Sequence, residues 1–76
     1  ENPEQFVEAS LRNSLELIPI DAVLGGTMRF GKMQLLGKNW IIAEYDDGHI
    51  LGRSIFKFGI NSNNELEFKE LDSIVN

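Results

Sequence analysis

The segment from Tyr45 to Ile50 reads Tyr-Asp-Asp-Gly-His-Ile and places two carboxylates beside the only histidine of the chain. Carboxylate oxygens and imidazole nitrogens bind zinc, and carboxylates also bind calcium. Even with Glu44 added from the same strand face, the group lacks a second histidine and the spacing of a calcium loop. Asp-Gly is also a favoured pair for a tight hairpin turn, in which Asp46 and His49 would face each other. For Asp46, Asp47 and His49 we therefore favour a turn over a metal site.

Other arrangements that could carry chemistry are incomplete. A serine nucleophile, Ser54 or Ser62 with His49, would need the strained turn that exposes a reactive serine, and the sequence has no such motif. Residues 25–27 lack the spaced glycines and the lysine of a phosphate-binding loop and are interpreted as a bend. The oxygens of residues 61–65 fit a loop better than a calcium site. The sequence predicts no catalytic residue, no metal, no cofactor and a protein that is not an enzyme.

Composition narrows the class of partner. Twelve acidic and seven basic residues give a net charge of −5, which opposes binding to nucleic acid and to anionic membrane surfaces. No apolar run approaches the roughly 20 residues of a membrane-spanning helix. The absence of cysteine excludes disulfides and thiolate chemistry. With 76 residues, 42% of them hydrophobic, the chain is expected to be a single packed domain over residues 1–76.

Hydrophobic periodicity predicts one helix followed by four strands. Asn2 and Pro3 are typical of a helix start, and Val7, Leu11 and Leu15 recur on one helical face, which predicts an amphipathic helix over about residues 3–15. The period then changes to two, and turn residues divide the remainder into strands at about 27–36, 39–46, 49–60 and 65–72. Such short connections require antiparallel neighbours. The predicted fold class is α+β, with the N-terminal helix packed on a curled four-stranded antiparallel meander.

Two details of the sheet follow from the same pattern. The alternation slips between Phe30 and Met33, which predicts a bulge near Gly31-Lys32. A two-residue turn at Asp47-Gly48 sets a register that places small residues at the middle of the inner face, where the helix could approach closely. This register pairs Tyr45 with Ile50, Ala43 with Gly52 and Ile41 with Ser54 on the inner face, and Glu44 with Leu51, Ile42 with Arg53 and Trp40 with Ile55 on the outer face.

The outer face is more apolar than a free surface requires. Aromatic and aliphatic side chains with an arginine nearby are typical of an interface, and the candidate binding residues are Trp40, Ile42, Leu51, Arg53 and Ile55. The partner would be another protein or a second copy. Alternatively, residues 17–24 or the C-terminal Ile74-Val75 fold over this face. A different hypothesis places Glu44, Tyr45 and His49 in a small-ligand or enzymatic pocket in the concave sheet.

The run from Ile18 to Arg53 resembles a small uncharacterised domain of secreted proteins and lipoproteins from low-GC Gram-positive bacteria. Residues 21–27 and the hairpin with Ala43-Glu44-Tyr45 and Asp47-Gly48-His49-Ile50 carry the resemblance. It implies an extracellular or cell-envelope location, with a lipid anchor on a segment upstream, although a cytoplasmic location stays open. One helix followed by a curled meander is also similar in layout to the cystatin-like and nuclear-transport-factor-2-like folds.

Overall fold

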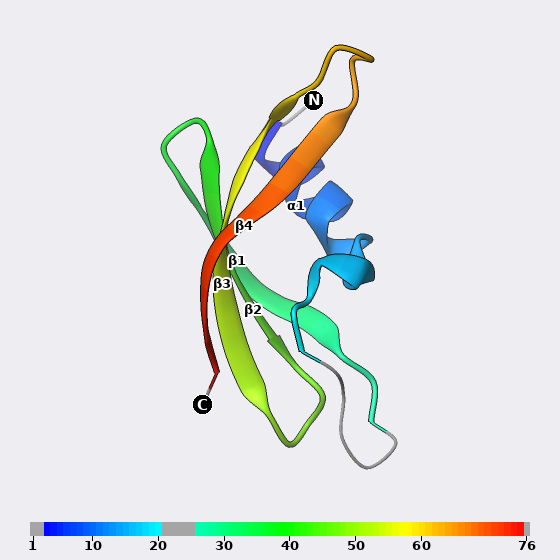
Figure 1. Cartoon of the computed structure of the whole chain (residues 1–76), viewed down its shortest axis with the longest axis vertical. Coiled ribbons are helices and arrows are strands. Elements are labelled where there is room, and N and C mark those ends of the chain that lie inside the picture. Colours follow the sequence, from blue (N-terminus) through cyan, green and yellow to red (C-terminus); the bar gives the residue numbers. More distant parts are fainter. Residues whose placement is uncertain (1–2, 21–25, 76) are drawn as a thin grey trace.

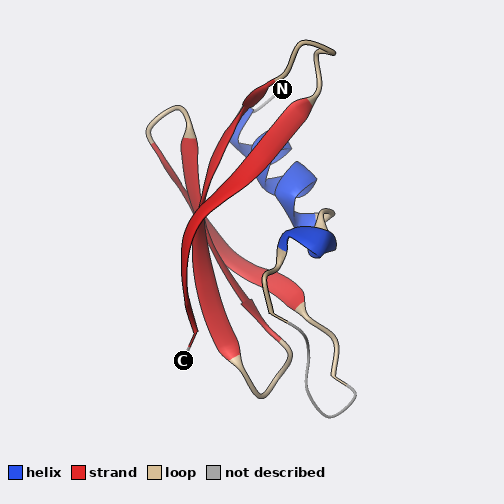
Figure 2. Cartoon of the chain, viewed as in Figure 1, coloured by secondary structure: helices blue, strands red, loops and turns tan. Residues whose placement is uncertain are grey.

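A computed structural model gives the arrangement of residues 3–20 and 26–75. In chain order these residues form α1 (Pro3–Arg12), the single-turn helix η1 (Leu15–Leu17), β1 (Arg29–Leu36), β2 (Trp40–Asp46), β3 (Leu51–Ile60) and β4 (Leu66–Val75). The four strands form one antiparallel sheet in the order β1-β2-β3-β4. Figure 1 shows α1 and η1 on one side of this twisted sheet, and Figure 2 shows the helical and strand segments by colour. The predicted α+β class with an antiparallel meander is confirmed.

The helix is shorter than predicted. It ends at Arg12, where Ser14 turns back so that its hydroxyl donates to the carbonyl of Ser10 at 2.9 Å. Serine competes in this way for backbone groups that would otherwise continue a helix. Val7 and Leu11 are buried as expected, but Leu15 lies beyond the last turn and is 48% exposed. Within the described part of the chain, no helix is both long and apolar enough to cross a membrane.

The predicted bulge in the first strand is confirmed. The register of β1 against β2 shifts between Phe30 and Met33, so that Phe30 lies opposite Tyr45 and Met33 opposite Ala43. Both β1 side chains therefore belong to the inner face despite their odd spacing. Arg12 connects the end of α1 to the bulge of β1, since its Nη1 donates to the carbonyl oxygen of Phe30 at 3.1 Å.

The predicted register of the β2–β3 hairpin is wrong by two residues. Asp46 lies opposite Leu51 and not opposite His49 as predicted, and residues 47–50 form a wider loop. The cause is the carboxylate of Asp47, whose Oδ1 accepts from the backbone N–H groups of His49 at 2.7 Å and Ile50 at 2.8 Å. A shift of two residues keeps every side chain on its predicted face. It does change the partners: Trp40 lies opposite Lys57, Ile42 opposite Ile55, and Glu44 opposite Arg53.

The last strand runs further than predicted. β4 continues to Val75 instead of ending near residue 72, so Ile74 lies opposite Arg53 in the ladder. The register shifts where Phe56 lies opposite Glu70 and Ile55 opposite Asp72, which leaves Leu71 as the extra residue of a bulge. The β-branched pair Ile74-Val75 favours this continued strand.

The core lies between the helices and the inner face of the sheet. Its fully buried side chains come from α1, β2 and β3 and include Leu11, Ile41, Ala43, Tyr45 and Phe56. Aromatic rings meet edge to face, with centroids 6.1 Å apart for Phe30 and Tyr45 and 6.4 Å apart for Phe30 and Phe56. The small residues of the inner face were expected to let the helix approach closely. At Gly52 the ring of Tyr45 takes this space instead, because Tyr45 Cε1 lies where a side chain at position 52 would begin.

Candidate functional site

The acidic segment of the β2–β3 loop uses its carboxylates to hold the loop. Asp46 Oδ1 accepts from the N–H of Gly48 at 3.0 Å, and Asp47 Oδ1 accepts from two further amides of the loop. Gly48 has a φ of +93°, a conformation that suits glycine. His49 is exposed, and the described residues contain no cluster of histidine and carboxylates with metal-binding geometry. The arrangement at Asp46 and Asp47 has the hydrogen bonds of a turn.

The three residues of the concave-pocket hypothesis do not converge. Tyr45 is fully buried on the inner face, whereas Glu44 points from the opposite face and forms an ion pair with Arg53. His49 lies in the loop beyond the end of β2. Because successive side chains of a strand point to opposite faces, Glu44 and Tyr45 cannot line one pocket.

A chain of hydrogen bonds runs from the core to the sheet edge. Tyr45 Oη lies 2.6 Å from Ser54 Oγ, and Ser54 Oγ donates to Glu70 Oε2 at 2.8 Å. Since the serine hydroxyl has one proton and gives it to Glu70, the phenol of Tyr45 donates to Ser54. Tyr45 and Ser54 are buried, while Glu70 lies on the exposed edge strand. The bulge at Leu71 turns Glu70 toward the inner face, and the chain thereby satisfies two buried hydroxyls.

This hydrogen-bond chain predicts a loss of stability at alkaline pH. Burial raises the pKa of Tyr45 above its usual 10.0, the charge of Glu70 raises it further, and the hydrogen bond with Ser54 opposes both. The unfolded chain therefore releases the phenolic proton at a lower pH than the folded chain. The contribution of Tyr45 to stability is complete below pH 10 and falls as the pH rises through the folded pKa.

Urea unfolding at a series of pH values measures this effect, and Tyr45→Phe is its control. The two proteins differ only in this hydroxyl, so the difference between the two pH profiles isolates the phenol. We expect the natural chain to lose more of its free energy of unfolding above pH 10 than the variant does. Parallel profiles would contradict the buried position of the hydroxyl.

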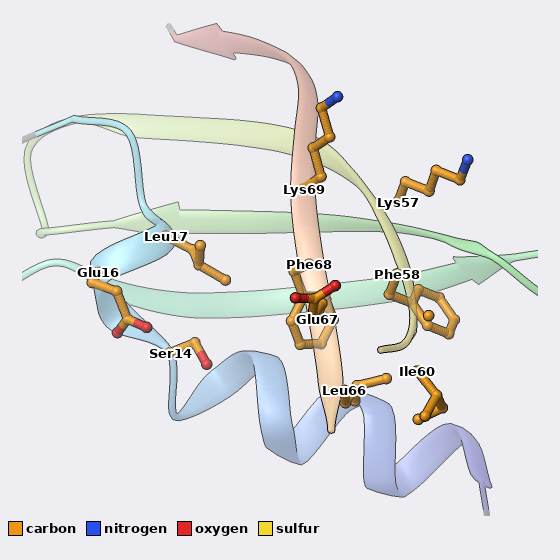
Figure 3. A pocket seen from close by; sticks show the side chains of 11 residues that line it. Ser14, Glu16, Leu17, Lys57, Phe58, Ile60, Leu66, Glu67, Phe68 and Lys69 are labelled. Atoms are coloured by element: carbon orange, nitrogen blue, oxygen red, sulfur yellow. The ribbon is translucent and has the colours of Figure 1, made fainter. Parts of the chain in front are cut away.

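A hollow of about 540 Å³ lies between η1 and the far end of the β3–β4 hairpin. Phe58, Leu66 and Phe68 form its apolar wall, and Glu16 and Leu17 border it from η1. Figure 3 shows Lys57 and Lys69 directed away from the helix. Ser14 also lines this hollow, but its hydroxyl donates to the backbone carbonyl of Ser10.

The outer sheet face presents a different surface. We call Trp40, Ile42, Leu51, Arg53 and Ile55 the outer patch; all five lie on the face opposite the helices. Trp40 is 47% exposed and Leu51 40%, while Ile42 and Ile55 are half-buried by their neighbours. Large apolar side chains gathered on one exposed face are typical of an interaction surface.

The two segments that could have covered the outer patch lie elsewhere where they are described. Leu17 and Ile20 pack against the core on the helical side of the sheet. Ile74 does not fold back but extends the outer face from β4, and it is 63% exposed. Residues 21–24 lie outside the described residues. Within the described chain, the exposed apolar surface of the outer face thus extends beyond the outer patch to Ile74 of β4.

Side chains from all four strands line two shallow hollows of this face. One of about 180 Å³ lies over β2, β3 and β4, where Ile42, Ile55 and Ile74 make it largely apolar. The other, of about 280 Å³, lies over β1, β2 and β3 between Gln34, Glu44 and Arg53. Ile42 and Arg53 border both hollows, so the centre of the outer patch is an uneven surface that side chains of a partner can enter.

Charged side chains surround this apolar centre. Glu44 Oε2 lies 3.7 Å from Arg53 Nη2, in a pair that remains open to solvent. Lys57 lies opposite Lys69, next to Trp40, and Asp72 lies opposite Ile55. Sequence reasoning missed Ile74 on this face because it ended the last strand at about residue 72, although the β-branched residues that follow were a signal for a longer strand. It missed Asp72 because the bulge at Leu71 shifts the alternation within that strand.

No protein-family model, curated protein or solved structure matches the chain. The resemblance to a secreted bacterial domain and the likeness in layout to the cystatin-like folds therefore stay predictions.

Proposed function

We propose that the chain is a non-enzymatic interaction module that binds a protein partner through the outer patch. The observation that carries the proposal is the exposure of Trp40, Leu51 and Ile74 on one sheet face that no described element covers. A core of tryptophan and isoleucine with arginine at its centre and other charges outside has the composition of a binding surface. The sequence resemblance supports placing this module in an extracellular or cell-envelope protein.

Photo-crosslinking from the outer patch tests the proposal. Trp40 is replaced by a photo-reactive phenylalanine analogue, and the protein is irradiated in the cells that produce it. We expect a crosslinked species of defined mass that disappears when Ile55→Asp is added, because a charge at the apolar centre cannot be buried without a partner.

Ile60→Asp is the matched control. It introduces the same side chain on the same strand, but at the 60% exposed end of β3 and on the inner-face side. The crosslink should survive this change, and both variants should keep the circular dichroism spectrum of the natural chain. Absence of any crosslink, or its equal loss in both variants, would contradict the proposed role of the outer patch.

A further inference from the structure

Facing residues at the centre of the outer face form complementary pairs. Across β2 and β3, the register sets Trp40 beside Lys57, Ile42 beside Ile55 and Glu44 beside Arg53. An indole face attracts an ammonium group, two isoleucines bury each other, and a carboxylate pairs with a guanidinium. The three pairs follow one another at alternate positions, so they form consecutive rows on one face.

A surface made of such rows is complementary to itself under one symmetry operation. Consider two outer faces turned toward each other, with a two-fold axis midway between them along the boundary of β2 and β3. This axis carries β2 of one copy over β3 of the other without changing the position along the strands. Trp40 then faces the second copy's Lys57, and Glu44 faces the second copy's Arg53. Each contact occurs twice, as in any isologous interface.

We infer that the partner of the outer patch is a second copy of this chain, packed face to face around this axis. The inference rests on the proposed function of the outer patch and adds the identity of the occupant. Aligned sheets pack about 10 Å apart at roughly 30°. With about 6.8 Å between rows, this angle moves the rows beside the central one sideways by about 4 Å, most of one strand spacing. The central row of Ile42 and Ile55 therefore stays over its complement, and in the two flanking rows the long side chains of Glu44, Arg53 and Lys57 must span the offset.

The same operation extends the match to the outer strands. Gln34 of β1 and Asp72 of β4 lie in the row of Ile42 and Ile55. The axis brings each Gln34 over the second copy's Asp72, where an amide can donate to a carboxylate. It also brings Ile42 over the second copy's apolar hollow, which Ile55 and Ile74 line. A standard interface buries about 800 Å² per partner, which is about 15% of the 5347 Å² surface of the described chain.

Pairing of two β4 edges is one competing way to join two copies, and the sequence of β4 opposes it. Residues 67–72 carry four charged side chains, Glu67, Lys69, Glu70 and Asp72. The bulge at Leu71 further interrupts the row of backbone groups that a second edge would need. Charges and bulges on an edge strand are the features by which proteins prevent edge pairing.

Two charge reversals test the axis, and sedimentation equilibrium of the purified 76-residue chain over a dilution series is the measurement. The natural chain is expected to dimerise reversibly. Glu44→Arg alone sets two arginines against each other in both symmetric contacts, and Arg53→Glu alone sets two glutamates against each other. Each variant should dimerise at least about tenfold more weakly, which corresponds to about 1.4 kcal/mol.

An equal mixture of the two variants should dimerise again. The new arginine at position 44 then faces the new glutamate at position 53 of the other chain, and the two unchanged residues also face each other. Neither chain can repair its own pair, so recovery in the mixture reports a contact between copies. Glu44→Arg changes the net charge of each copy from −5 to −3, which by itself should reduce the repulsion between two copies and strengthen the dimer. The local contact between two arginines predicts the opposite, a weaker dimer.

Glu65→Arg, in the β3–β4 loop, is the matched control with the same net charge of −3 and should dimerise at least as well as the natural chain. Thermal unfolding checks that both patch variants are folded. A chain that is monomeric at every concentration would overturn the inference, and a crosslink from position 40 to a different protein would then leave the proposed function standing. A dimer insensitive to both reversals, or one weakened by each without recovery in the mixture, would overturn the face-to-face axis.

Discussion

Replacing Gly52 with alanine is expected to lower the free energy of unfolding by about 2 to 3 kcal/mol. A Cβ at this position would lie 2.5 Å from Cε1 and 3.2 Å from Cζ of Tyr45, and 3.3 Å from the carbonyl oxygen of Ile74. The ring of Tyr45 is fully buried, and its hydroxyl is held by Ser54, so the ring cannot move aside without losing a hydrogen bond. For a domain of 76 residues this is a large part of a total stability of about 4 to 11 kcal/mol.

Gly59→Ala is the matched control, since it lies on the same strand and a Cβ there would meet nothing within 4 Å. Urea unfolding followed by circular dichroism measures both changes, and the control should cost less than about 0.5 kcal/mol. Making Tyr45→Leu both in the natural chain and in the Gly52→Ala variant completes a double-mutant cycle. We expect a favourable coupling of about 1 kcal/mol or more in the double variant. Equal costs at Gly52 and Gly59 would contradict the position of the Tyr45 ring.

Phe56→Ala should be the most damaging single truncation, with a cost of about 3 to 5 kcal/mol. Phe56 is fully buried at the centre of β3, and its ring centroid lies 6.4 Å from those of Phe30 and Phe68. Removing the ring leaves a cavity against both aromatic neighbours, which the sheet and the helix can only partly close. In a domain this small, the variant is expected to populate the unfolded state at room temperature.

Phe6→Ala serves as its control, because Phe6 is 49% exposed on α1 and should cost less than about 1 kcal/mol. The thermal midpoint of each variant, measured by circular dichroism, gives the comparison. A Phe56→Ala chain that unfolds at the same temperature as Phe6→Ala would show that β3 does not carry the core.

These core substitutions and those of the outer patch separate stability from binding. Gly52 and Phe56 lie on the inner face of β3, whereas Arg53 and Ile55 lie on the outer face of the same strand. Changes at the inner positions should lower stability in proportion to lost packing. Changes at Glu44 and Arg53 should alter association while the stability of the monomer itself changes little, because an exposed ion pair contributes only about 0 to 1 kcal/mol.

Several elements could be predicted from the sequence because they depend on local periodicity. The alternation of β2 and β3 assigned Ile41, Ala43 and Tyr45 to the buried face and Trp40 and Ile42 to the other, as observed. The slip in alternation around Gly31-Lys32 identified the bulge of β1. Side chains alternate between the two faces of a strand, so an error of two residues in the register leaves every side chain on its predicted face. The assignment of faces therefore did not depend on the details of the turn.

The pairing of side chains was decided only by the tertiary structure. Asp47 binds two amides across its own loop, and this widens the turn and moves β3 by two residues. Glu44 consequently meets Arg53, and Ile42 meets Ile55, which are the rows on which the inferred dimer depends. In the same way, a bulge at Leu71 brings Glu70 to the hydroxyl of Ser54, 16 residues away along the chain.

Hydrophobic alternation was enough to predict the class of the fold, the buried face and the apolar character of the outer face, because it encodes which side of a strand faces the core. The residues that stand opposite one another and the length of β4 could be read only from the folded chain. Those features depend on a few hydrogen bonds in loops and bulges, whose geometry no periodic pattern records.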